Sequence, residues 1–228
     1  MIAPLLAWLD GAALVAFGVP ITWAEVLGDV AGAACVVLVV RQNILSWPIG
    51  LLNNVFWGWL FYRAKLYGDS SLQGVFFVLG LYGWWRWAAV STRARGSRAS
   101  TTTGSVASGG PGPKLPVRRT RASEWRVLAV GLAISTTAVA AFLAGQTDSP
   151  APVADASVLT LSLAATWGQA QKLLESWWLW IAVDVISVPL YASRALYPTA
   201  ALYVAFGVLC VFGLRAWSRD LAAPVTSP

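Results

Sequence analysis

The sequence contains no histidine, and only 11% of its 228 residues are charged. Histidine is the commonest acid–base group and metal ligand in proteins, so its absence removes the usual basis for a metal or general-base site. A soluble domain carries roughly a quarter charged residues. Most of this surface therefore meets something other than water, and an enzyme or a cofactor protein is not expected.

Cysteine is almost as scarce as histidine. Cys35 and Cys210 lie in separate apolar runs, which predicts small apolar filler residues and not a disulfide or a metal site. The first residues lack a basic region, and Asp10 interrupts their apolar stretch, so no cleavable signal peptide is expected.

Apolar residues make up 57% of the chain, the mean hydropathy is +0.64, and tryptophan occurs 14 times. Crossing a bilayer takes about 20 consecutive apolar residues. Seven stretches of this kind predict an all-α polytopic membrane protein, and residues 1–18 are expected to form an interfacial amphipathic helix or an eighth span. The seven stretches are Trp23–Val40, Trp47–Lys65, Ser70–Val90, Trp125–Ala144, Val153–Gln171, Trp177–Ser193 and Leu196–Trp217.

The net charge of +6 raises the question of nucleic-acid binding, but the basic residues gather in one segment and at the ends of apolar stretches. Residues 91–123 are rich in Ser, Thr, Gly and Pro and carry seven Arg or Lys, which predicts a disordered linker on the cytoplasmic side. The loop at 147–157 has two acids and no base, so it is expected outside. The tail at 218–228 is then cytoplasmic, the lipid bilayer is the partner of this surface, and no nucleic-acid partner is expected.

An internal repeat organises the chain. Shifting the sequence by 130 positions aligns 43–87 with 173–217 without a gap, and twelve of the 45 positions are identical. Both copies carry Ser-Trp, then Leu-Tyr, then a closing Gly-x-x-x-Trp. A repeat of this length constrains the architecture of the whole chain.

Two copies of three helices run parallel only if one further span separates them. The segment at 124–146 supplies that span between a first triple-helix repeat at 22–90 and a second at 152–217. The sequence thus predicts a 3+1+3 arrangement with the substrate at the interface between the repeats.

Candidate binding residues fall on matched helical stripes. Helical spacing places Trp177, Trp180 and Asp184 on one face with Tyr191 below them. A carboxylate at mid-membrane depth is costly unless it meets water, a partner or a ligand; the alternative is a hydrogen-bonded packing residue. The remaining candidates are the equivalent stripe of the first repeat and polar or aromatic residues aligned with it: Trp47, Asn54, Trp57, Gln73, Trp84 and Gln171.

The motifs WPIGLLNNVFW, LYGDSSLQ, YGWWRW, QKLLESWWLWIAVDVISVPLY and ALYPTAALY resemble the PnuC family of bacterial vitamin transporters, relatives of the SWEET sugar transporters. The resemblance implies a 3+1+3 fold, a homo-oligomer (a trimer), and facilitated diffusion of nicotinamide riboside across the bacterial cytoplasmic membrane for NAD biosynthesis. Thiamine or riboflavin is the alternative substrate. The resemblance also implies that Trp177, Trp180, Asp184 and Gln73 are substrate contacts. The chain departs from the family pattern at Ser176, where many members have Asn, and in its long basic linker.

Nicotinamide riboside combines a cationic aromatic ring with a ribose. Trp faces attract such a ring, by about 2 kcal/mol or more when it is desolvated. We therefore expect Trp177 and Trp180 to sandwich the ring while Asp184, Asn54 and Gln73 bind polar groups. A scaffold without transport, and coupling to protons or sodium through Asp184, are the competing interpretations.

Overall fold

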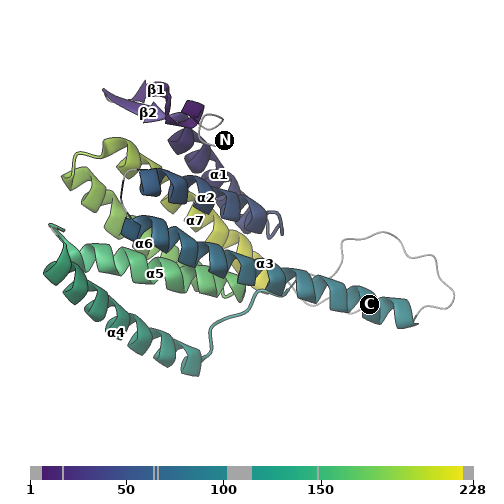
Figure 1. Cartoon of the computed structure of the whole chain (residues 1–228). Helices are drawn as coiled ribbons and strands as arrows, with labels where there is room; N and C mark the ends of the chain where they lie inside the picture. Colours follow the sequence, from purple (N-terminus) through teal and green to yellow (C-terminus); the bar gives the residue numbers. More distant parts are fainter. Residues whose placement is uncertain are drawn as a thin grey trace.

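The computed structural model describes residues 7–16, 18–63, 65, 67–101, 115–147 and 149–222. Within these residues the chain is mainly helical, as expected, and seven α-helices follow one another (Figure 1). Their bounds are α1 Trp23–Val40, α2 Ser46–Arg63, α3 Tyr67–Thr101, α4 Ala122–Gln146, α5 Pro152–Ala170, α6 Ser176–Ser193 and α7 Tyr197–Ala222.

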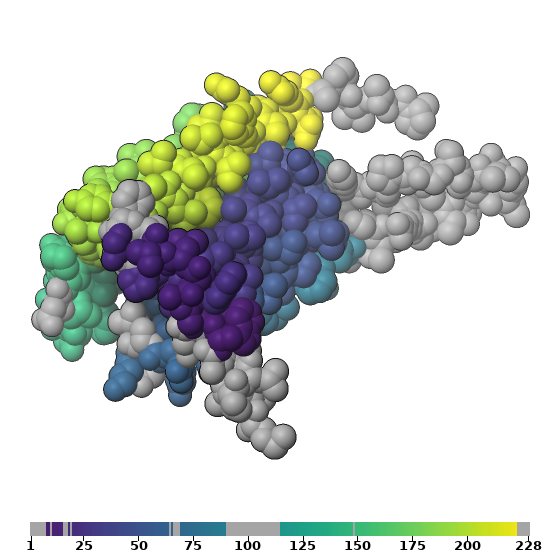
Figure 2. Space-filling view, turned by 90° about the horizontal axis from the view of Figure 1, so that it is seen from above, coloured from purple at the N-terminus to yellow at the C-terminus, as the bar shows by residue number. Residues whose placement is uncertain are grey.

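The helices form two packed groups. In one group α2 packs against both α1 and α3; in the other, α6 packs against both α5 and α7. The groups meet where α1 lies along α7 and α3 lies along α5, and Figure 2 shows α1 against α7 from above. Helix α4 packs on α5 at the edge of the bundle, and none of its residues is buried. Since a helix this exposed and this apolar is stable only in an apolar medium, α4 faces lipid or another apolar surface.

Among the described helices, α1, α4 and α7 are long and apolar enough to cross a membrane by composition alone. The others fall short because Trp and polar residues lower their hydropathy, as with the three Trp in each of α2 and α6. The chain is a multi-pass membrane protein.

Each group contains the same tryptophan packing. Two indoles meet edge to face with ring centroids 5.4 Å apart, at 84° in one group and 89° in the other. A glycine one turn before the second indole makes room: a Cβ at Gly83 would lie 2.1 Å from the first indole, and a Cβ at Gly213 would lie 2.4 Å from it. The pairs are Trp47–Trp87 and Trp177–Trp217. Only glycine permits this approach, which explains the repeated Gly-x-x-x-Trp.

The backbone repeats at the same offset. Gln42 and Lys172, which follow α1 and α5, both have φ 52°, and Lys65 and Ala195, which follow α2 and α6, have φ 60° and 58°. A left-handed residue after the last helical turn closes a helix and turns the chain back. Left-handed residues therefore recur at the 130-residue offset of the sequence repeat.

The amino-terminal region differs from the expectation. Ala7–Asp10 forms a 3₁₀ turn, and β1 (Ala12–Ala16) pairs antiparallel with β2 (Val19–Thr22), so no α-helix is present over the described part of 1–18. Gly18, at φ 80°, makes the turn, and Pro20 disfavours a helix. Residues 1–6 and 17 lie outside the described residues.

The expected linker at 91–123 also differs. Helix α3 continues to Thr101, because Ala and Arg extend a helix that is already nucleated. Residues 115–121 are extended, and Arg118 forms a parallel bridge with Leu173. Residues 102–114 lie outside the described residues. The segment is therefore helical at 91–101 and extended at 115–121, where disorder was expected.

Candidate functional site

One face of α6 carries three buried polar atoms that have no hydrogen-bond partner among the described residues. They are Trp180 Nε1, Asp184 Oδ2 and Ser187 Oγ, at i, i+4 and i+7. Asp184 is 5% exposed and Ser187 is 0% exposed. Burying a polar group without a partner costs about 1–3 kcal/mol, and more for a charge. The Tyr203 hydroxyl approaches Ser187 and the Cys210 thiol approaches Asp184. The hydrogen-bonding capacity that remains on these three groups indicates a site that a polar ligand or water satisfies.

Helix α7 forms the wall opposite this face. A Cβ at Gly207 would lie 3.5 Å from the Asp184 Cβ, so α7 approaches the carboxylate closely. Cys210 lies beside Asp184, but a thiol is a weak donor and does not replace a cation. Below them Tyr203 stacks on Tyr191 with ring centroids 5.1 Å apart. The Asp184 stripe thus ends on an aromatic floor.

Helices α1 and α2 bring the other half of the bundle to the same region. Asn53 Nδ2 donates to the Gly28 carbonyl at 2.6 Å, which ties α2 to α1. A Cβ at Gly32 would lie 3.7 Å from Phe206 Cζ, so an aromatic side chain of α7 reaches α1. Small residues on α1 therefore let side chains of α2 and α7 approach α1 closely.

The structure gathers some of the expected residues and separates others. Trp180, Asp184 and Tyr191 share the α6 face. On α2, Asn54 and Trp57 are half-buried, and a Cβ at Gly28 would lie 2.9 Å from Trp57 Nε1. Gln73 of α3 is half-buried, with its Cβ against Gly58 of α2.

Trp47 and Trp177 belong to the packed core. Trp177 is 0% exposed and Trp47 is 8% exposed, each enclosed by its partner indole and a glycine. The expected sandwich of a ligand ring between Trp177 and Trp180 is therefore not available in this structure, because no face of Trp177 is open. The physical reason is the Gly213 contact, which holds the indole inside the α6–α7 packing.

Two further expected residues lie elsewhere. Trp84 is 40% exposed and sits on the outer surface beside Leu81 and Trp85, so the structure does not bring it to the α6 face. Gln171 is buried, and its Nε2 donates to the Tyr82 hydroxyl at 2.7 Å. That bond joins the α5–α6 turn to α3 and gives Gln171 a structural partner.

Sequence reasoning missed Tyr203 and Gly207 as walls of the site. The repeat held the signal for one of them, since Tyr203 is the position equivalent to Gln73 at the 130-residue offset. For Gly207 no sequence signal was available, because a helical glycine gains meaning only from what approaches it.

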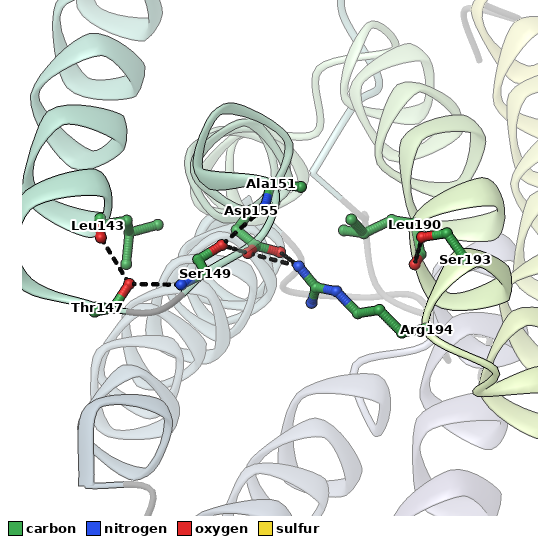
Figure 3. Close-up of polar contacts among 8 residues, drawn as sticks. All are labelled: Leu143, Thr147, Ser149, Ala151, Asp155, Leu190, Ser193 and Arg194. Carbon is green, nitrogen blue, oxygen red and sulfur yellow. Dashed lines mark hydrogen bonds and ion pairs between the residues drawn. The ribbon is translucent and has the colours of Figure 1, made fainter.

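At the opposite end from the α7 carboxyl terminus, a polar network closes the second group (Figure 3). Arg194 Nη2 lies 2.8 and 3.0 Å from the two carboxylate oxygens of Asp155, and Ser149 Oγ donates to Asp155 at 2.5 Å. This pair ties the start of α5 to the end of α6. The pair also gives the basic residue Arg194 an acidic partner on the side of the membrane that is expected to be outside, where basic residues are disfavoured.

Comparisons with known proteins agree with this architecture. A family model described as nicotinamide mononucleotide transporter matches residues 22–219. The riboflavin/roseoflavin transporter RibM of Streptomyces davaonensis is 30% identical over 222 residues, covering 96% of each chain. The nicotinamide riboside transporter PnuC of Escherichia coli is 26% identical over 221 residues, covering 88% of this chain and 87% of that one. A crystal structure of the vitamin B3 transporter PnuC matches with a TM-score of 0.66 at 19% identity, covering 88% and 82%.

Proposed function

Since the chain belongs to the nicotinamide mononucleotide transporter family, we propose that it takes up nicotinamide riboside by facilitated diffusion across the bacterial cytoplasmic membrane. The PnuC relatives named for that vitamin support the substrate. RibM supports riboflavin as the second candidate.

The observation that carries the proposal is the Asp184 carboxylate between Trp180 and Ser187, whose Oδ2 has no hydrogen-bond partner among the described residues. A buried carboxylate is stabilised by a cationic partner, and the pyridinium of nicotinamide riboside is a permanent cation. Trp180 adds a π face that attracts a cationic ring. Ser187 Oγ can bond to a ribose hydroxyl, so one ligand supplies a counter-charge for Asp184 and a hydrogen-bond partner for Ser187.

Riboflavin would use this site differently. Its ring system is larger and neutral, so it gives the Asp184 carboxylate no counter-charge. Its ribityl hydroxyls could donate to the carboxylate, which is a weaker compensation than an ion pair. Thiamine, a cationic aromatic vitamin, would satisfy Asp184 as well as nicotinamide riboside does.

We further propose that α1–α3 and α5–α7 are two parallel triple-helix repeats joined by α4, with the substrate between them. Support comes from the equal left-handed turns, the equal Trp–Gly packings and the exact correspondence of α2 with α6 at a shift of 130. The exposed basic residues Arg215 and Arg219 near the end of α7 favour a cytoplasmic carboxyl terminus. The bare apolar surface of α4 is compatible with a trimer.

Parallel calorimetric titrations of the detergent-purified protein with nicotinamide riboside, thiamine and riboflavin test the substrate. Saturable binding of nicotinamide riboside alone is the expected result. Binding of riboflavin alone would move the protein to the specificity of RibM while keeping the fold. No binding of any of the three would contradict a vitamin transporter.

Replacing Trp180 with Ala is expected to weaken nicotinamide riboside binding about tenfold or more, because a desolvated cation–π contact is worth about 2 kcal/mol. Trp178→Ala is the matched control: that indole is on the same helix but 57% exposed on the outer surface. Calorimetry on both variants checks the prediction. An unchanged dissociation constant for Trp180→Ala would remove Trp180 from the site.

A further inference from the structure

The buried residue Lys172 is not part of the candidate binding site. It is 1% exposed, at the turn between α5 and α6, and its ammonium lies 4.4 Å from the centroid of the Trp87 ring on α3. Lys172 Nζ donates to Gln42 Oε1 at 2.7 Å, and Gln42 Nε2 donates to Asp220 near the end of α7. A buried ammonium is tolerated only with such partners. These four residues, Gln42, Trp87, Lys172 and Asp220, are called the latch below.

The latch crosses the boundary between the two groups of helices. Gln42 and Trp87 come from the first group, whereas Lys172 and Asp220 come from the second. Gln42 and Lys172 are equivalent positions of the repeat, and they meet side chain to side chain. Further bonds cross at the same end, from Trp217 Nε1 to the Val39 carbonyl at 3.2 Å and from Gln171 to Tyr82.

The segment at 115–121 is hydrogen-bonded to the turn that carries Lys172. The Arg118 amide donates to the Lys172 carbonyl at 3.1 Å, and the Leu174 amide donates back to the Arg118 carbonyl at 3.0 Å. Thr120 donates to Glu175 through both its amide and its hydroxyl, at 2.8 Å each. The Arg118 guanidinium pairs with Glu124 of α4 at 2.8 Å, which raises the pKa of Arg118. The turn that carries Lys172 is therefore held from the side of α4 as well.

We propose that the latch is the gate on the cytoplasmic side of the transport path, closed in this structure and broken each time substrate is released inward. The inference rests on the proposed function for its direction and goes beyond it in naming the gate. The ammonium of this network is buried, whereas Gln42 is half-buried and Asp220 is exposed. A buried charge is costly once its partners are lost, so the contact favours two discrete states. Separating the helix groups at this end breaks the Lys172–Gln42 contact and hydrates both side chains.

The native thiol of Cys210 reports on this gate without any substrate. Cys210 is 4% exposed and lies beside Asp184 in the candidate site. It is ten residues before Asp220 on α7, about 15 Å along the helix. A water-soluble thiol reagent arriving from the Asp220 end must pass the latch to reach it. Cys35→Ala leaves Cys210 as the one thiol of the sequence.

The experiment measures the rate at which a membrane-impermeant methanethiosulfonate labels Cys210 in inverted membrane vesicles of the Cys35→Ala parent. Lys172→Met removes the ammonium, and Gln42→Asn shortens the bridging amide while tolerating the left-handed backbone. We expect labelling about tenfold faster in each, the factor that loss of one charge-assisted hydrogen bond gives an opening equilibrium. Arg219→Met, an exposed charge change beside Asp220, is expected to label at the parent rate.

Two variants protect the result against misfolding, since Gln42→Asn leaves the buried ammonium in place. Parent rates in both latch variants would overturn the gate. Uptake of nicotinamide riboside is measured separately, in right-side-out vesicles that carry the same variants. Absent uptake with accelerated labelling would contradict the proposed substrate and leave the gate standing.

Discussion

An Asp184→Asn variant is expected to bind nicotinamide riboside about fiftyfold more weakly than the parent protein. The amide has the shape of the carboxylate, so the close approach of Gly207 is kept and packing changes little. What is lost is the attraction of a buried negative charge for a pyridinium, about 2–3 kcal/mol for a charge-assisted contact. Calorimetry on the purified variant measures the change directly.

Two comparisons make the Asp184 result specific. Asp69→Asn changes an exposed carboxylate at the start of α3 and is expected to leave the dissociation constant unchanged. Riboflavin, which is neutral, should lose little affinity on Asp184→Asn if it binds at all. Equal affinities of parent and Asp184→Asn for nicotinamide riboside would contradict a counter-ion role and reduce Asp184 to a packing residue.

A Gly213→Ala variant is expected to lose stability severely. The new Cβ would lie 2.4–2.5 Å from three atoms of the Trp177 ring, and the ring cannot retreat because it is 0% exposed. Overpacking of a tight core typically costs about 1–3 kcal/mol, and a clash with a buried indole lies at the upper end of that scale. For a chain of this size that lowers the melting temperature by about 10 °C, measured in detergent.

Gly131→Ala is the matched control for this prediction. A Cβ there meets nothing within 4 Å, and alanine favours a helix over glycine, so stability should stay equal or rise slightly. Combining Gly213→Ala with Trp177→Phe, a smaller ring, should restore part of the loss. Gly213→Ala with the melting temperature of the parent would show that the indole can move, which would reopen Trp177 as a ligand contact.

Much of the fold could be predicted from the sequence. Apolar runs of bilayer length located the seven helices. The left-handed turns at the 130-residue offset are a finding of the structure. Apolar runs are a local signal, so composition suffices to read them. The structure differs from the expected helix over the described part of 1–18 and from the expected disorder at 91–101 and 115–121 for the opposite reason. The turn geometry at Gly18 decides the structure of the first segment, and cooperative extension of the nucleated helix α3 decides the second. Composition alone reports neither effect.

The candidate site was only partly predictable. Helical spacing predicts that Trp180, Asp184 and Tyr191 share a face, and all three lie on the single helix α6. Periodicity cannot say which neighbour covers that face, so it could not separate Trp180 from Trp177, which Gly213 encloses. Nor could it foresee that Lys172, a residue at the end of an apolar stretch, is buried with its ammonium against the Gln42 and Trp87 side chains.

The edge-to-face indole pairs also give the protein a built-in optical probe. Rings held 5.4 Å apart at nearly right angles, one pair in each helix group, form asymmetric chromophores whose near-ultraviolet circular dichroism depends on fixed side-chain packing. Trp47→Phe and Trp177→Phe each remove one pair. Difference spectra of the two variants would therefore follow the melting of each helix group separately, without an added label.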